Sequence, residues 1–182
     1  ALASSKANDP EVDTFEAIKQ AARGLTGEAG DKCLYILDSG LSTEGELNVL
    51  SENLHRLIDV QPIVDKLQKD HALPDLTGVQ VVWIGLGDAA DKQEDLTSRN
   101  KNTLKELWEA VLTTSGAEVT FKNLPLTEEG STDRELPEVT PIPIGHDSND
   151  FDPLQVNQVK PLFNGDEATF VDRDDAVSEL SP

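Results

Sequence analysis

The feature that most constrains the fold of this chain is a short apolar run at Val79–Ile84, which reads VQVVWI. It follows the turn signal Thr77-Gly78 and precedes a glycine-rich turn at residues 85–88. A continuous apolar run of this length is typical of a β-strand covered on both faces, as in parallel sheets flanked by helices. The sequence therefore predicts a buried strand here and an α/β fold for the region around it.

Strand and helix patterns alternate on either side of this run. Two further short runs favour strands, and four stretches repeat apolar residues at helical spacing. We expect strands at Lys32–Leu37 and Glu118–Lys122, and helices at residues 13–25, 45–59, 97–115 and from Pro62 up to Pro74. Helices between consecutive strands indicate an open, mostly parallel sheet whose loops after the strands gather at one edge.

Charge limits the partners of the chain. Its 35 acidic residues outnumber its 15 basic residues, which gives a net charge of −20 over 182 residues. A field of this sign repels nucleic-acid phosphates and anionic lipid surfaces, so we expect no nucleic acid partner. No apolar run approaches the roughly 20 residues that a membrane-spanning helix needs, so we expect no membrane insertion by this chain.

The distribution of charge and proline divides the chain. Residues 1–125 hold 21 acidic and 12 basic residues, whereas residues 126–182 hold 14 and 3, so the shorter part carries most of the net charge. Seven of the ten prolines also lie beyond residue 122, where they disfavour helix. We expect an α/β domain at residues 1–126, an acidic proline-rich linker at 127–150 and an acidic extension at 151–182.

Small and acidic residues follow the first two predicted strands. Because the carboxyl ends of parallel strands meet at one edge of a sheet, we expect these residues to form a ligand or partner edge. Asp38 is a candidate ligand for Mg²⁺ or Ca²⁺, and the alternative is that these side chains cap their own loops. No other cofactor is expected. The edge residues are Asp38, Ser39, Gly40, Ser42, Gly87 and Asp88.

No pattern in the sequence indicates an enzyme active site. His55, His71 and His146 share no metal-ligand spacing, and no GxSxG nucleophile turn occurs. Residues 85–90 formally fit the GxGxxA pattern of dinucleotide-binding folds, but several residues separate this turn from the next helix, so a tight turn is the simpler interpretation. Cys33 is the only cysteine, lies in an apolar run and is expected to be a buried structural thiol.

The order of these segments resembles the later half of a von Willebrand factor A domain. The most specific segments are ILDSGLST at residues 36–43, ALPDLTGVQVVWIGLGDAA at 72–90 and LWEAVLTTSGAEVT at 107–120. Over residues 10–126 the chain resembles the A-like segment of actinobacterial cell-envelope proteins that end in an OmpA-like module. Residues 168–172, ATFVD, are similar to the opening strand of such a module.

This resemblance implies a non-enzymatic interaction domain of a secreted or membrane-anchored bacterial envelope protein, with an extracytoplasmic location. It implies a protein or cell-wall partner, and peptidoglycan association for the parent protein. It also implies that the first strands of the A-like domain, with the DxSxS metal motif of adhesive A domains, lie outside this chain. Of the other metal ligands, the aspartate position falls at Asp38 or Ser39, and the threonine position falls near Val12, two residues before Thr14.

Two alternative functions remain open. A divalent-metal-dependent adhesion domain would use Asp38, and a nucleotide-dependent enzyme would use the turn at residues 85–90. A sheet with the three predicted strands also has unpaired edges, so we expect another segment to pair there. Residues 138–144 at an edge position, or a segment of the parent protein, are the two candidates.

Overall fold

The structure is a computed structural model that describes residues 11–89, 92–122 and 140–144. All of these residues belong to the compact unit Ala1–His146. Of the linker expected at residues 127–150, only 140–144 are described, and the extension expected at 151–182 lies outside the described residues.

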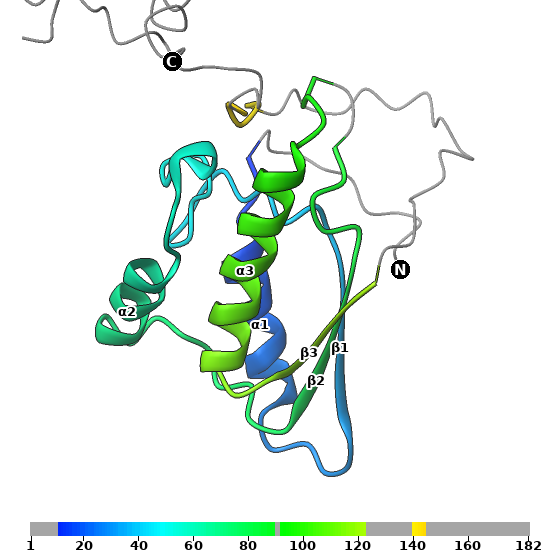
Figure 1. Cartoon of the computed structure of the whole chain (residues 1–182). Helices are drawn as coiled ribbons and strands as arrows, with labels where there is room; N and C mark the ends of the chain where they lie inside the picture. Colours follow the sequence, from blue (N-terminus) through cyan, green and yellow to red (C-terminus); the bar gives the residue numbers. More distant parts are fainter. Residues whose placement is uncertain (1–10, 90–91, 123–139, 145–182) are drawn as a thin grey trace, which may run out of the picture. The chain divides into compact units, whose positions relative to one another are not determined.

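The described residues form a mixed α/β fold, and the three predicted strands are confirmed (Figure 1). The strands are parallel, in the order β1-β2-β3, with Leu34 opposite Val81 and Val81 opposite Val119. In chain order the elements are α1 (Thr14–Leu25), β1 (Lys32–Leu37), the 3₁₀ helix η2 (Leu54–Arg56), α2 (Gln61–Lys69), β2 (Val79–Ile84), α3 (Ser98–Thr114) and β3 (Glu118–Lys122).

Only one face of the sheet is covered by described elements, so the prediction that β2 is covered on both faces is wrong. In Figure 1 the three α-helices all lie on one side of the sheet. Along β2, Val79, Val81 and Trp83 are buried, whereas the side chains between them are exposed or half-buried. Apart from Gln80, the run is apolar because Val82 and Ile84, on the open face, are apolar as well.

The core lies between this covered face and the helices. Trp83 of β2 and Trp108 of α3 are fully buried, and their ring centroids are 4.9 Å apart. From α1, Phe15 and Ile18 join the same cluster, which follows from their spacing on one side of the helix. Burying two tryptophans at one point anchors α3 to the sheet near the carboxyl end of β2.

The helix predicted at residues 45–59 is wrong, because only η2 is helical there. The buried leucines that suggested it, Leu47 and Leu54, are held instead by an irregular loop. Gly45 and Asn53 have positive φ angles of 85° and 52°, which interrupt any α-helix. The Asn48 side chain also donates to the Thr43 carbonyl, so a side chain takes the place of a backbone partner.

Cys33 is exposed, so the prediction of a buried thiol is also wrong. It lies on β1, on the open face of the sheet, two residues before Tyr35. The pKa of Tyr35 is raised, chiefly by a hydrogen bond with the Cys33 side chain. The error arises because a short apolar run was taken as evidence of burial on both faces, whereas β1 is an edge strand and no described element covers its second face.

Candidate functional site

Asp38 follows β1 and caps the loop that it begins. Its carboxylate Oδ1 accepts a 2.7 Å hydrogen bond from the Gly40 backbone N–H and a 3.0 Å hydrogen bond from the Thr14 hydroxyl. Thr14 is the first residue of α1, so this one oxygen links the loop after β1 to the start of the helix. The carboxylate therefore has a structural role in the loop, which is the alternative that the sequence left open.

Ser42 is fully buried and joins the same loop to the segment before α1. Its hydroxyl accepts from the Thr14 backbone N–H at 3.2 Å and donates to the Val12 carbonyl at 3.1 Å. The Thr43 hydroxyl accepts from the Val12 backbone N–H at 3.0 Å. Because the Ser42 hydroxyl is buried and already bonded, it is not available to a ligand.

Two indole groups of the core donate hydrogen bonds to the backbone of the loop after β1. Trp83 Nε1 donates to the Asp38 carbonyl at 2.7 Å, and Trp108 Nε1 donates to the Gly40 carbonyl at 2.9 Å. Both rings are fully buried, and each buried indole N–H needs such a partner. The strand and helix predictions gave no indication of these two bonds, although the place of Trp83 near the carboxyl end of its strand is an available signal for one of them.

The loops after β1 and β2 contact each other, as predicted for the edge of a parallel sheet. The Gly87 backbone N–H donates to the Ser39 carbonyl at 2.8 Å, and the Asp88 backbone N–H donates to the Gly85 carbonyl at 3.0 Å. Gly87 has a φ of 75°, a conformation that glycine adopts without strain. The six predicted edge residues thus lie on two joined loops.

A cleft of about 200 Å³ opens beside these loops, and it includes only part of the predicted edge. Ser39 and Asp88 line it, whereas Asp38, Gly40, Ser42 and Gly87 do not. The residues that line it are Val12, Ser39, Leu41, Thr43, Asp88, Ala89, Gln93, Thr140 and Ile142. Its wall is therefore a mixture of aliphatic, hydroxyl and amide side chains with one carboxylate.

Residues 140–144 form one side of this cleft, and Gln93 holds them there. Gln93 Oε1 accepts a 2.7 Å hydrogen bond from the Ile142 backbone N–H, and Gln93 Nε2 donates to the Ile142 carbonyl at 3.2 Å. Ile142 is only 3% exposed and belongs to the buried apolar cluster. Residues 138–144 were one of two candidates for pairing at a sheet edge, and the described part, 140–144, is not a strand and lies at the cleft.

Glu11 makes a second attachment for this segment. Its Oε1 accepts a 2.9 Å hydrogen bond from the Thr140 hydroxyl. Hydrogen bonds from the Thr43 and Thr140 hydroxyls lower the pKa of Glu11 below its usual value. The ionised carboxylate thus links the loop after β1 with the segment across the cleft.

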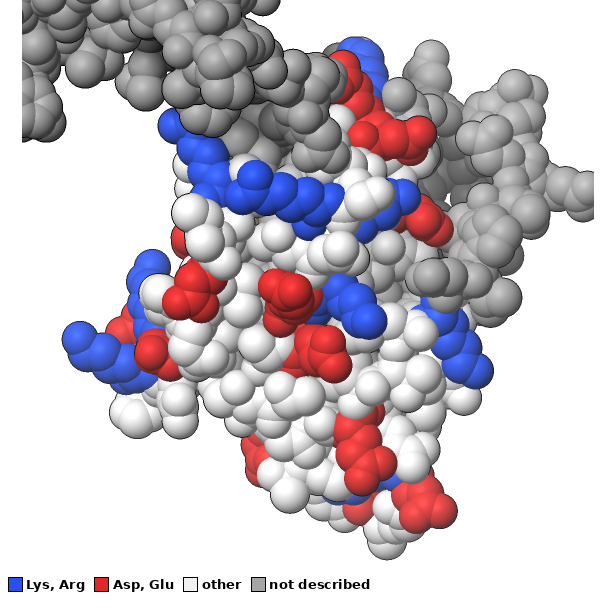
Figure 2. Space-filling view, in the orientation of Figure 1, with Lys and Arg blue, Asp and Glu red and all other residues white. Residues whose placement is uncertain are grey.

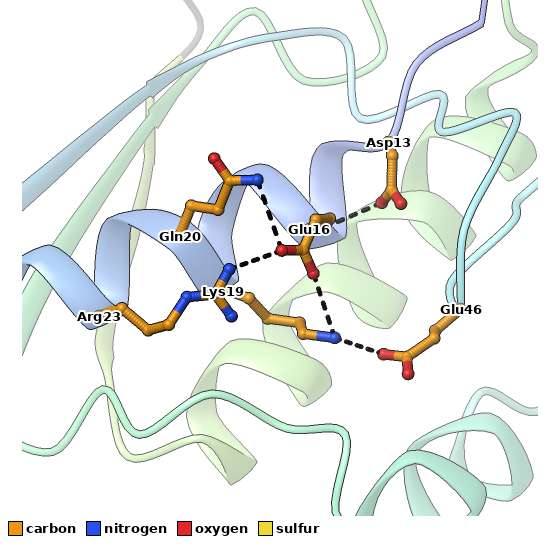
Figure 3. A network of polar contacts seen from close by, with 6 residues as sticks. All are labelled: Asp13, Glu16, Lys19, Gln20, Arg23 and Glu46. Atoms are coloured by element: carbon orange, nitrogen blue, oxygen red, sulfur yellow. Dashed lines mark hydrogen bonds and ion pairs between the residues drawn. The ribbon is translucent and has the colours of Figure 1, made fainter.

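A charged network on α1 links this helix to Glu46, in the irregular segment that follows β1 (Figure 3). Lys19 Nζ lies 2.7 Å from Glu46 and 3.2 Å from Glu16, and Arg23 lies 2.6 Å from Glu16. The bonds from Arg23 and Lys19 lower the pKa of Glu16, and the bond to Glu46 raises that of Lys19. At the start of the helix the Asp13 side chain accepts from the Glu16 backbone N–H and so caps the helix.

Two features that a metal ion or a dinucleotide would need are not found among the described residues. Within residues 11–89, 92–122 and 140–144, no three His, Cys, Asp or Glu side chains are grouped so that they could hold a metal ion. The helix after the turn at 85–88 begins only at Ser98, and Thr97 already caps it by accepting from the Asn100 backbone N–H. This helix N-terminus is therefore separated from the glycine turn that a dinucleotide would need.

Surface charge on the side of the molecule seen in Figure 2 is mixed. Acidic and basic side chains are interspersed there, and several basic side chains gather near the N-terminal end of α3. No helix within the described ranges is long and apolar enough to cross a membrane.

Comparison with known proteins found no relative of this chain. No protein-family model matches the chain, and no curated protein or solved structure shows a significant match. The described residues form a mixed α/β fold with a three-stranded parallel sheet and a cleft at the carboxyl edge of that sheet.

Proposed function

We propose that this chain is a non-enzymatic protein-interaction domain of a bacterial cell-envelope protein. In this proposal the location is extracytoplasmic, and the parent protein associates with peptidoglycan, as the sequence resemblance implies. The observation that carries the interaction role is the open face of the sheet, where Tyr35 is 62% and Leu37 is 69% exposed.

The open face is apolar along its centre and balanced in charge. Tyr35 and Leu37 of β1 lie beside Val82 and Ile84 of β2, because Tyr35 pairs with Val82 and Leu37 with Ile84 in the parallel register. On β3 the outward residues include one acidic and one basic side chain, Glu118 and Lys122. In a chain with a net charge of −20, such a neutral and apolar strip is a favourable surface for another polypeptide.

The size of the open face favours one helix as its occupant. Three strands of about six residues present roughly 300 Å², because strands lie about 4.8 Å apart and rise about 3.3 Å per residue. A stable dimer buries about 800 Å² on each partner, so two copies joined by this face alone would have too small an interface. A helix about 10 Å wide covers such a strip over about 13 residues. We therefore propose that an apolar-faced helix of another polypeptide binds this open face.

Cys33 provides a direct test, because it is the only cysteine of the chain and is exposed on this face. In the isolated protein its thiol is expected to react with maleimide at the rate of an exposed thiol. In the envelope fraction of the producing cells, the bound helix is expected to slow this reaction at least tenfold. Mass spectrometry of the labelled peptide measures both rates.

A matched control separates docking from general shielding. The double variant Cys33→Ser, Glu109→Cys moves the thiol to the exposed side of α3, away from the sheet. Its labelling is expected to be equally fast in both preparations, and Leu37→Asp is expected to restore fast labelling of Cys33 in the envelope fraction. Equal labelling of Cys33 in the two preparations would contradict the proposal.

One observation favours a second candidate, the divalent-metal-dependent adhesion domain. The Thr14 hydroxyl lies 3.0 Å from the Asp38 carboxylate, which brings together a threonine at the start of α1 and an aspartate of the loop after β1. If these oxygens bind a cation, Mg²⁺ or Ca²⁺ must replace the hydrogen bonds that Asp38 now accepts.

Titration calorimetry with MgCl₂ and CaCl₂ decides between the two candidates. The interaction domain without a metal is expected to give no saturable heat with either cation. A saturable heat that disappears in Asp38→Ala, but persists in Asp88→Ala, would establish the metal-dependent candidate instead.

A further inference from the structure

The contact between Gln93 and residues 140–144 has the form of peptide recognition. A side-chain amide that accepts from one backbone N–H and donates to the carbonyl of the same residue pairs with the chain as a neighbouring strand would. In this structure Gln93 makes both bonds to Ile142, at 2.7 Å and 3.2 Å. Such pairing reads the backbone, so it accepts any residue whose side chain fits the adjoining space.

Because the segment contains two prolines, the side-chain amide of Gln93 alone can satisfy its backbone N–H groups. Pro141 and Pro143 have no backbone N–H, so Ile142 carries the only backbone donor between Thr140 and Ile144. That donor is the one that Gln93 accepts. A segment of this pattern can therefore be buried at a single position without leaving an unpaired N–H group, and it cannot continue as a hydrogen-bonded strand.

The burial of one side chain, that of Ile142, determines which segments fit the cleft. Ile142 is buried while Pro141 and Pro143 are exposed, so the segment enters the domain through one aliphatic side chain. The space beside Ile142 is lined by Val12, Leu41 and other residues of the cleft. About 200 Å³ of this cleft is open next to the bound segment, which leaves room for a larger or differently placed aliphatic group.

We propose that this cleft is a binding site for an extended polypeptide segment with the pattern proline-aliphatic-proline, and that residues 140–144 are its tethered occupant. An external segment of the same chemistry displaces them. Residues 140–144 belong to the same chain as the cleft, so an external segment competes with an occupant whose binding is intramolecular. The site lies at the strand ends, so its test is independent of the open face of the sheet.

The proposal is tested with a synthetic peptide that copies residues 138–145, EVTPIPIG, carrying a fluorophore. The full chain with Ile142→Asp cannot seat its own segment and is expected to bind the peptide, as measured by fluorescence anisotropy. The unmodified chain is expected to bind it at least tenfold more weakly, because its own segment competes. A peptide with aspartate at the position that copies Ile142 is expected to bind neither chain.

Gln93 supplies the matched control within the protein. Adding Gln93→Leu to the Ile142→Asp chain removes the backbone pairing and is expected to weaken peptide binding at least tenfold. If the Ile142→Asp chain does not fold, as judged by circular dichroism, a chain with residues 140–144 replaced by Gly-Ser-Gly-Ser-Gly takes its place. Absence of peptide binding to a folded chain with the cleft vacated, or equal binding to the unmodified chain, would overturn the proposal.

Discussion

Replacing Trp108 by alanine is expected to lower the free energy of unfolding by about 3–5 kcal/mol, the cost typical of removing a buried aromatic side chain. The ring is fully buried and packs against Trp83, and its Nε1 holds the Gly40 carbonyl at 2.9 Å. The change thus opens a cavity in the core and frees the loop after β1. Urea denaturation followed by circular dichroism measures the loss.

Trp108→Phe keeps an aromatic ring in the core but loses the N–H donor and part of the indole, so it is expected to destabilise the protein less than Trp108→Ala does. Leaving the Gly40 carbonyl without this partner is expected to cost about 1–3 kcal/mol. If Trp108→Phe were as stable as the original protein, the indole hydrogen bond would have no role in holding the loop.

Gly40→Ala is expected to destabilise the protein by about 2–4 kcal/mol, from backbone strain together with overpacking. Gly40 has a φ of 75°, which an alanine adopts only with strain. An added Cβ would also lie 2.8 Å from Trp108 Nε1 and 2.5 Å from Leu86 Cδ1, inside the buried core. Thermal unfolding should show the loss as a clear decrease in Tm.

Gly24→Ala is the matched control. Gly24 lies within α1, and nothing is within 4 Å of the position that its Cβ would take. The substitution is expected to stabilise the helix by about 0.5–1 kcal/mol, because alanine loses less backbone entropy than glycine. Destabilisation by both substitutions to a similar degree would mean that the environment of Gly40 has no special importance.

The strands and their parallel order were predictable from the sequence because local signals are strong there. Val79–Ile84 and Lys32–Leu37 are short apolar runs bounded by turns, and both form strands with the predicted bounds. Burial was less predictable, since an apolar side chain reads the same on a covered and an open face. The exposure of Cys33 and Tyr35 depends on which face lacks helices, and that is a property of the whole fold.

The candidate site shows the same division. The meeting of the loops at Ser39 and Gly87 follows from parallel topology, and it was predicted. The pairing of Gln93 with Ile142 joins residues 49 positions apart, across segments with no periodicity, so no local pattern indicates it. The leucines near η2 gave a wrong prediction, because they follow helical spacing although they lie in a loop. The positive φ angles of Gly45 and Asn53 interrupt a helix there.

The simple strand order β1-β2-β3 also bears on how the protein forms. Each strand pairs with the one that follows it in sequence, so the sheet can assemble in steps as the chain leaves the ribosome, without waiting for a distant segment. Residues 140–144 can dock only after the loops that follow β1 and β2, including Gln93, are in place. Their attachment is therefore expected to be the last folding step of the described domain, and the first contact to open.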